Sequence, residues 1–404
     1  MRAAAAAVAV AAGLAMAAFG AGAEETSPFH FQATVATQAH PAFDAPYSGK
    51  NSLRPEAESA TSVVMDLIGV FRLWPGSELT VQPELSGGRG LSSTLGVAAF
   101  PSGEVYRVGD PDPTIVLARL ALKQVLGPVT ITLGKFAIPD LFDSVPLSND
   151  PHTRFMSWGL FASAAYDYPA DVRGYTIGAA LELGRDWWSA RAGIFLEPKS
   201  ANGADLEYDL GIARGLVAEV EARGARGAVR LLGFLNTANM GSYTKAIEQK
   251  VDVTQTRANG RTKAGLAASA NWDFGAGLGA FARASFNDGK NETWAFTEID
   301  RSVALGVVQS GGRWGRELDE AGAAVVVSGL SSLHRSYLAG GGYGFLIGDG
   351  ALSYAVEVLG EIYYRAALTS QISLGVNYQP VFNPAYNKDR GPAHVFTGRA
   401  HVAF

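Results

Sequence analysis

The sequence contains no cysteine in 404 residues, and its six histidines are scattered. Without cysteine the protein can form no disulfide framework, thiol nucleophile or thiolate metal site. No serine, histidine and acid arrangement and no metal-ligand spacing emerges, so we predict neither an enzyme nor a metal or other cofactor. The formal net charge of −5 gives no reason to expect nucleic-acid binding.

Long hydrophobic runs are also lacking beyond the N-terminus. The chain starts with a basic residue, Arg2, an Ala-rich apolar run through Phe19 and an A-x-A site at Ala21-Gly22-Ala23. These features are typical of a secretory signal peptide, so we expect residues 1–23 to be removed after Ala23. No later stretch approaches the run of about 18 apolar residues that a membrane-spanning helix needs. The mature protein is therefore expected to be exported.

Apolar residues are nevertheless abundant, at 48%, and in the last twelve residues they alternate with polar ones. One face of this segment would carry Phe396, Gly398, Ala400, Val402 and Phe404, and the other Thr397, Arg399, His401 and Ala403. Such alternation predicts a strand with one apolar and one polar face. A final strand that ends in Phe is typical of bacterial outer-membrane barrels, although an edge strand of a soluble β protein would show the same pattern.

Segments of this kind recur along the chain, and sixteen can be counted. They span 29–40, 62–73, 79–87, 114–123, 128–138, 173–184, 186–198, 207–221, 226–237, 263–274, 276–287, 300–311, 319–329, 351–365, 368–380 and 393–404. Gaps of at most seven residues alternate with gaps of eight to 34 residues. Outer-membrane barrels have short periplasmic turns and longer extracellular loops, whereas a soluble sandwich has no reason to alternate in this way. We therefore predict an all-β fold over 24–404, a transmembrane antiparallel β-barrel of sixteen strands with both termini in the periplasm.

Two positions fit this pattern poorly. Pro83 lies inside a predicted strand, where proline removes a hydrogen-bond donor, so it indicates a bulge or a strand drawn too long. Arg214 falls on the lipid-facing parity of segment 207–221, so that strand contains a bulge or begins later.

Charged residues fall almost wholly on one parity of the segments, as expected for a water-filled lumen. In segment 114–123 we assign Val116, Ala118, Leu120 and Leu122 to the lipid face and Arg119 and Lys123 to the lumen. The other predicted lumen residues are Asp66, Arg72, Gln82, Glu84, Glu182, Arg191, Arg230, Arg283, Glu357, Glu361 and Arg399. A charge on the lipid face would cost about 2–4 kcal/mol at the membrane midplane. A lumen with both signs of charge suits polar, largely uncharged solutes, although each residue could also be simply solvated.

The longest gap, 139–172, is the third predicted extracellular loop. Its aromatic residues need burial, which the loop would gain by folding inward against the barrel wall; they are Phe142, Phe155, Trp158 and Phe161. Asp140, Asp143 and Arg154 could then bind sugar hydroxyls while an aromatic ring such as Trp158 stacks on the sugar. The alternative is a structural plug whose aromatics only pack against the wall.

Several segments, in order along the chain, resemble the carbohydrate-selective outer-membrane porins of the OprB type. They are Gly134-Lys135-Phe136 through Asp143, Asp167-Tyr168-Pro169-Ala170-Asp171, Trp294 through Arg301, Trp314-Gly315-Arg316, Gly329-Leu330-Ser331 with His334-Arg335, Gly344 through Gly350, and Asn383 through Pro392. The resemblance implies a sixteen-stranded porin for glucose and similar sugars. It makes Arg72, Glu84, Arg119 and Lys135 the best pore candidates. The loop 238–262 matches least, so selectivity can differ there.

The predicted pore-constriction residues are therefore Arg72, Glu84, Arg119, Lys123, Lys135, Asp140, Asp143, Arg154 and Trp158. Substitution of Arg72 and Arg119 by alanine should weaken the block of the ion current by sugar. The runner-up function is a general or acidic-oligosaccharide porin, and a structural or adhesin barrel would instead have a closed lumen. The expected partners are outer-membrane lipid, carbohydrate solutes and the barrel-assembly machinery, through Phe404. The sequence leaves open the particular sugar and the choice between monomer and homotrimer.

Overall fold

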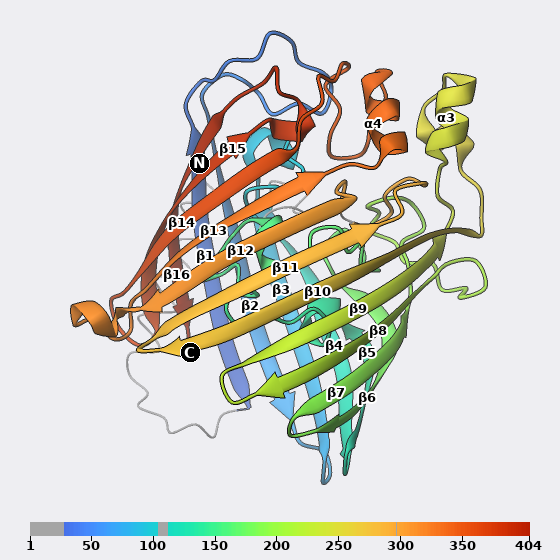
Figure 1. Cartoon of the computed structure of the whole chain (residues 1–404). Coiled ribbons are helices and arrows are strands. Elements are labelled where there is room, and N and C mark those ends of the chain that lie inside the picture. Colours follow the sequence, from blue (N-terminus) through green and yellow to red (C-terminus); the bar gives the residue numbers. More distant parts are fainter. Residues whose placement is uncertain (1–27, 104–111, 296) are drawn as a thin grey trace.

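The computed structural model describes residues 28–103, 112–295 and 297–404, which form one closed antiparallel barrel of sixteen strands (Figure 1). The predicted signal peptide lies outside the described residues. The strands are β1 (Phe29–His40), β2 (Glu58–Phe71), β3 (Ser77–Gly88), β4 (Thr114–Leu126), β5 (Val129–Phe136), β6 (Thr176–Arg185), β7 (Trp188–Phe195), β8 (Arg214–Gly224), β9 (Gly227–Ala238), β10 (Arg261–Gly275), β11 (Leu278–Asn287), β12 (Arg301–Ser310), β13 (Glu320–Gly329), β14 (Glu357–Ala367), β15 (Ile372–Phe382) and β16 (Ala393–Ala403). Each predicted segment corresponds to one strand, so the predicted fold is confirmed.

The first and last strands close the barrel. Their register pairs Gln32 with Ala403 and Ala39 with Phe396. The Phe404 N–H donates to the Phe31 carbonyl over 2.9 Å, and the two rings stack with centroids 5.8 Å apart. The barrel therefore has no free sheet edge.

Alternation along each strand separates an apolar outer face from a polar inner face. In β12, Val303 and Leu305 are 52% and 54% exposed, while the alternating residues Ser302 and Ala304 are buried. Charged strand residues predicted to face the lumen are buried within the barrel, as Glu357, Glu361, Arg230, Arg283 and Arg399 show. No described helix is both long and apolar enough to cross a membrane.

The bulge expected at Pro83 is present, and it corrects part of the face assignment in β4. Gln82 pairs with Arg119 and Pro83 with Leu117, so Ala118 is the extra residue. The extra residue reverses the parity of the strand beyond it, because side chains alternate with a period of two. Val116, assigned to the lipid face, therefore lies opposite the inward-facing Glu84, and Ala118 is fully buried. The second irregularity is explained by the later start of the strand: β8 begins at Arg214, which keeps the outward parity of Leu216 but lies at the end of the strand, where a charge on the lipid side costs least.

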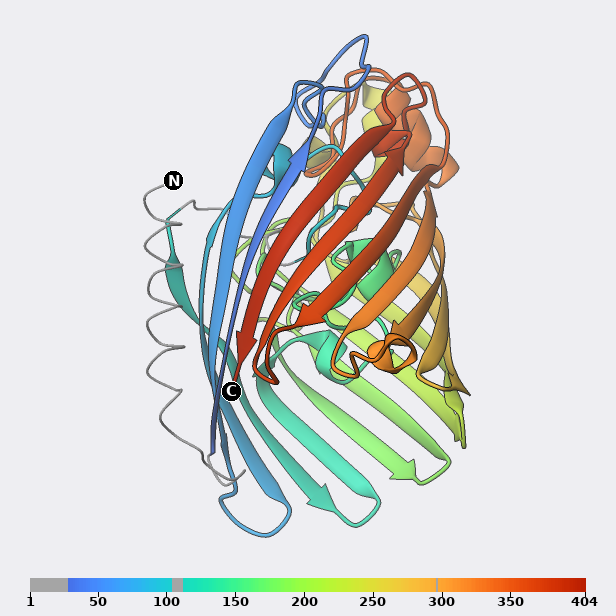
Figure 2. The ribbon, with the colours of Figure 1, turned by 90° about the vertical axis from the view of Figure 1, so that its left-hand side faces the viewer.

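Long loops lie at one end of the barrel, the loop end, and short turns at the other, the turn end. The helices α3 (Tyr243–Gln249) and α4 (Ser332–Ala339) pack against each other at the loop end (Figure 1). The remaining short helices are η1 (Leu91–Thr94), η2 (Ile138–Asp140), α2 (Trp158–Phe161), η3 (Val253–Thr256), η4 (Gly311–Trp314) and η5 (Pro384–Tyr386). The helices η2 and α2 belong to the third long loop, which Figure 2 shows inside the ring of strands.

Candidate pore constriction

The third loop, residues 137–175, joins β5 to β6 and carries its own apolar core. Phe142, Phe155 and Trp158 are at most 2% exposed, and Phe161 packs partly buried beside them. Phe155 meets the strand residues Phe281 and Tyr363 edge-on, with centroids 5.5 and 4.9 Å apart. The burial of these aromatics explains why the segment turns inward instead of projecting into solvent.

A buried arginine on β11 fixes the loop at three points along its length. The Arg283 guanidinium forms an ion pair with Asp143 and donates to the Asn149 side chain over 2.7 Å and to the Phe161 carbonyl over 3.0 Å. On β8, Glu219 accepts the Asp143 N–H over 2.7 Å. Several N–H groups of the Arg283 guanidinium are therefore bonded to the loop. Because the guanidinium is charged, these hydrogen bonds are stronger than bonds between neutral groups.

The middle of the loop, residues 151–157, is fixed by three charged side chains on β13, β14 and β16. Glu320 accepts two bonds of 2.9 Å from Arg154, and Glu361 accepts the N–H groups of Met156 and Ser157 over 2.8 and 3.0 Å. Arg399 donates to three carbonyls of the same loop, at 2.8–3.0 Å; these are Pro151, Thr153 and Arg154. Glu361 and Arg399, both predicted to line the channel, thus hold the loop across it, together with Glu320, which was not predicted.

The second loop also enters the barrel, which the sequence analysis missed. Glu357 on β14 accepts the N–H groups of Ala98 and Ala99 over 2.9 and 2.7 Å. The next residue, Phe100, stacks on Trp158 with centroids 5.6 Å apart. The uninterrupted apolar run 95–100 inside an otherwise polar loop was the available signal.

These contacts decide which predicted loop residues a solute can reach. Asp143 and Trp158 are buried within the loop core, where the Asp143 carboxylate pairs with Arg283 and the Trp158 ring stacks on Phe100. Arg154 keeps 27% of its side chain exposed, although Glu320 engages two of its nitrogens. Its carboxylate neighbour Asp150 has a lowered pKa: burial alone would raise it, but His152 and a hydrogen bond from Thr153 outweigh that effect.

A continuous row of hydrogen-bonded polar side chains crosses four strands and reaches the third loop; we call it the polar row. It consists of Gln32, Asp66, Gln82, Arg119 and Asp140. Gln32 and Gln82 each donate to Asp66 over 2.7 Å, and Arg119 donates to Gln82 over 2.6 Å. Arg119 also forms a two-pronged ion pair with Asp140, with both bonds 2.6 Å long. Arg119 and Asp140 are 24% and 33% exposed, so this end of the row is accessible.

Beside the polar row lies a second group centred on Tyr175, the Tyr175 cluster. It consists of Glu84, Lys135, Asp171, Arg173 and Tyr175. Tyr175 donates to Glu84, while the cations of Arg119 and Lys135 lie 5.5 and 6.0 Å from its ring centroid. Lys135 also lies 3.5 Å from Asp171 and is 25% exposed. The structure thus brings together four of the nine predicted residues: Glu84, Arg119, Lys135 and Asp140.

A pair of histidines extends the polar row toward β16, and the sequence analysis did not single it out. The Thr34 hydroxyl lies 3.0 Å from the His152 ring nitrogen Nδ1 and 2.9 Å from that of His401. His152 also lies 3.3 Å from the Gln32 amide. Because these residues are more than 100 positions apart in sequence, only the closed barrel reveals the group.

Arg72 and Lys123 lie elsewhere, together at the turn between β2 and β3. Parity predicted the inward direction of these two side chains but not their height in the barrel. Lys123 lies four residues closer to the turn end than Arg119 on β4, about 13 Å at a rise of about 3.3 Å per residue. We therefore expect Arg72→Ala and Lys123→Ala to change the sugar concentration that half-blocks the current by less than about twofold, a free energy below about 0.4 kcal/mol. Titration of the single-channel current with glucose measures this half-blocking concentration. A larger shift for either variant would mean that the substituted residue belongs to the sugar-binding site.

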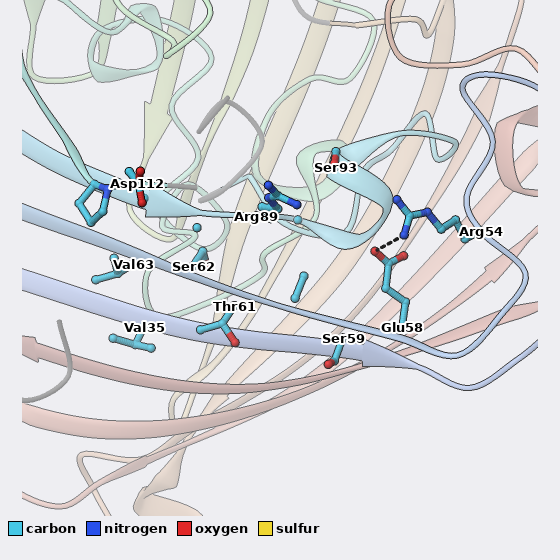
Figure 3. A pocket seen from close by; sticks show the side chains of 15 residues that line it. Val35, Arg54, Glu58, Ser59, Thr61, Ser62, Val63, Arg89, Ser93 and Asp112 are labelled. Atoms are coloured by element: carbon cyan, nitrogen blue, oxygen red, sulfur yellow. Dashed lines mark ion pairs between the residues drawn. The ribbon is translucent and has the colours of Figure 1, made fainter. Parts of the chain in front are cut away.

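The hollow in Figure 3 is distinct from this interior site. It lies where β1, β2 and the second loop meet, and its floor includes Val35, Thr61 and Val63, whose parity is opposite to that of Thr34 and Asp66. Arg54 and Glu58 lie next to each other at one end of it, with 4.0 Å between the guanidinium and the carboxylate. This hollow therefore opens on the outside of the barrel.

The interior arrangement can bind a polar, uncharged solute. Arg119 and Lys135 offer donors and Asp140 offers acceptors, all partly exposed, and each cation has a carboxylate partner nearby. Sugar hydroxyls both donate and accept, so a mixed wall can replace part of their hydration. Paired charges also prevent a strong field of one sign, which would favour ions over neutral molecules.

Residues 50–404 match the model of a family described as "Carbohydrate-selective porin, OprB family". Among solved structures, the high-pH structure of Pseudomonas putida OprB is similar, with a TM-score of 0.75, 16% identity and coverage of 93% of this chain and 94% of that one. A loop L8 deletion mutant of OmpT from Vibrio cholerae is also similar, with a TM-score of 0.51, 11% identity and coverage of 93% and 99%. At these identities the likeness shows the fold alone. No curated protein matches the sequence.

Proposed function

Since the chain belongs to the OprB family of carbohydrate-selective porins, we propose that its constriction selects small neutral sugars of the glucose type. The protein is a carbohydrate porin of the bacterial outer membrane and not an enzyme, as the family and the barrel establish. The observation that supports the finer proposal is the partly exposed end of the polar row beside the Tyr175 cluster, where Arg119, Asp140 and Lys135 meet.

The preference for neutral sugars follows from charge pairing at this site. The Arg119–Asp140 pair is neutral as a unit and fixed by two short bonds, so its remaining donors and acceptors are already oriented. Preorganised polar groups bind without the entropy cost of ordering flexible side chains. An acidic sugar would gain attraction from Arg119 and Lys135 but would be repelled by Asp140, Asp171 and Glu84.

Single-channel recordings in planar bilayers test this proposal. We expect glucose to reduce the ion current in a saturable manner, and glucuronate at equal concentration to reduce it less. A current that no sugar affects would contradict sugar selection at the constriction. Stronger block by acidic oligosaccharides than by glucose would favour the runner-up, an acidic-oligosaccharide porin.

Export and assembly complete the proposal. We propose that residues 1–23 are cleaved after Ala23, which the mass of the mature protein's N-terminal peptide tests. We also propose that the assembly machinery recognises the Phe404 ring, which is 38% exposed at the turn end.

Phe404→Ala is expected to lower the amount of folded barrel in the outer membrane severalfold. The variant keeps the backbone bonds to Phe31, so it loses only the ring and its stacking, worth about 0.5–1.5 kcal/mol. Heat-modifiable mobility of outer-membrane fractions measures the folded amount, and Phe404→Tyr is the matched control. If the purified variant shows the same loss of folded barrel when it folds in detergent, where no assembly machinery is present, the ring acts through barrel stability and not through recognition.

A further inference from the structure

The outer wall of the barrel carries a notch made by two alanines in register. A single cross-strand row runs over β9 to β13 and consists of Leu231, Ala268, Ala284, Val303 and Val327. The large members of the row stand out from the wall, with Leu231 53% and Val303 52% exposed. Ala268 and Ala284 between them leave a groove open on the membrane side.

The groove continues along the wall toward the turn end. The next row down pairs Ala270 with Ala282, again between larger residues, and the following row pairs Trp272 with Ala280. From Ala284 to Ala280 the alanine positions of β11 span four residues, or about 13 Å at a rise of about 3.3 Å per residue. Leu266 and Phe286 border this stretch toward the loop end and Trp272 stands beside Ala280, so the stretch is an apolar channel that fits part of an extended acyl chain.

Two arginines stand at the loop end of the groove. Arg301 is the first residue of β12, is exposed, and shares the outward parity of Val303. Arg335 on α4 lies with its guanidinium 5.0 Å from the ring centroid of Tyr354, which lines the groove. Within the described residues neither guanidinium forms an ion pair with a carboxylate. A charge on the lipid side is tolerated near the interface, where its cost falls to about 0–1 kcal/mol.

We propose that this groove binds an outer-leaflet lipid with a phosphate monoester headgroup, one acyl chain of which lies along the alanines. Guanidinium groups match phosphate oxygens in geometry as well as charge, and two of them at one mouth can hold a dianionic headgroup. The hollow of Figure 3 also has two arginines, Arg54 and Arg89, but it holds the carboxylates of Glu58 and Asp112 as well, and hydroxyl groups line its floor.

Native mass spectrometry of the full-length protein in detergent tests the proposal with diphosphorylated lipid A, phosphatidylglycerol and phosphatidylethanolamine as probes. We expect lipid A to be retained best. The double variant Arg301→Gln with Arg335→Gln should lose about tenfold in affinity, as should Ala284→Phe, which fills the notch without adding charge; tenfold corresponds to about 1.4 kcal/mol.

The control is Arg89→Gln, which removes another exposed arginine near the loop end but not from the groove. It should leave lipid retention unchanged. Single-channel conductance and heat-modifiable mobility should be unaltered in all variants, since the groove lies outside the lumen. Equal retention by the double variant, no effect of Ala284→Phe, or equal binding of phosphatidylglycerol would overturn the proposal.

Discussion

An Arg283→Met variant is expected to give single-channel currents that are larger and noisier than those of the unaltered protein. Arg283 binds the third loop at Asp143, Asn149 and Phe161, and both Arg283 and Asp143 are nearly inaccessible to water. Removing one partner of a buried ion pair costs about 3–5 kcal/mol, because it leaves an unpaired buried charge. The loop can avoid that cost by leaving the wall, which widens the channel. Planar-bilayer recording measures the conductance, and limited proteolysis of the loop measures its release.

The double variant Asp143→Asn with Arg283→Met separates loop release from general damage. With both charges gone no buried charge remains unpaired, so conductance and protease resistance should return part of the way toward normal. Arg223→Met is a matched control, because Arg223 bonds to the Arg185 and Trp188 carbonyls at the turn end. If Arg283→Met leaves both the conductance and the proteolysis pattern unchanged, Arg283 does not fix the loop.

The barrel could be predicted from the sequence because the features that specify it are local, that is, each can be seen within a short segment of the chain. Period-two alternation marks each strand and the length of each gap marks its end of the barrel, so even the last strand, 393–404, was placed within one residue. The assignment of residues to the lipid or the lumen face failed where one extra residue in a strand reverses the direction of every side chain beyond it. Ala118 did so in β4, and its bulge could be inferred only from Pro83 on the neighbouring strand.

The interior could not be predicted to the same depth, because its contacts join distant residues. Glu357 binds the Ala98 N–H across more than 250 positions, and parity alone cannot distinguish such a buried anchor from a lumen residue. Parity also says nothing about height, so Arg72 and Arg119 seemed equivalent although one lies at the turn end. Trp158 was expected to contact either sugar or the wall, and Phe100, from a loop not considered, packs on it.

Arg119→Ala is expected to raise the glucose concentration that half-blocks the current by about tenfold and to make the channel more cation-selective. A hydrogen bond to a charged group contributes about 1.5–3 kcal/mol, and partial exposure of Arg119 to water places the loss near the lower end. Without the guanidinium, Asp140 loses both short bonds and presents an unpaired negative charge to the lumen. Glucose titration of the current and reversal potentials in a salt gradient measure the two effects.

Charge and hydrogen bonding at this site can be separated by a second pair of variants. Arg119→Ala with Asp140→Asn should restore the original ion selectivity, since neither charge of the pair remains, but should not restore sugar block, since the oriented donors are still missing. Lys135→Gln, which keeps a donor but not the charge, should change selectivity more than block. Arg72→Ala is the matched control, because it removes an arginine that the structure places at the turn end. If Arg119→Ala alters block no more than Arg72→Ala does, the polar row does not contact the sugar, and selection must occur at another level of the channel.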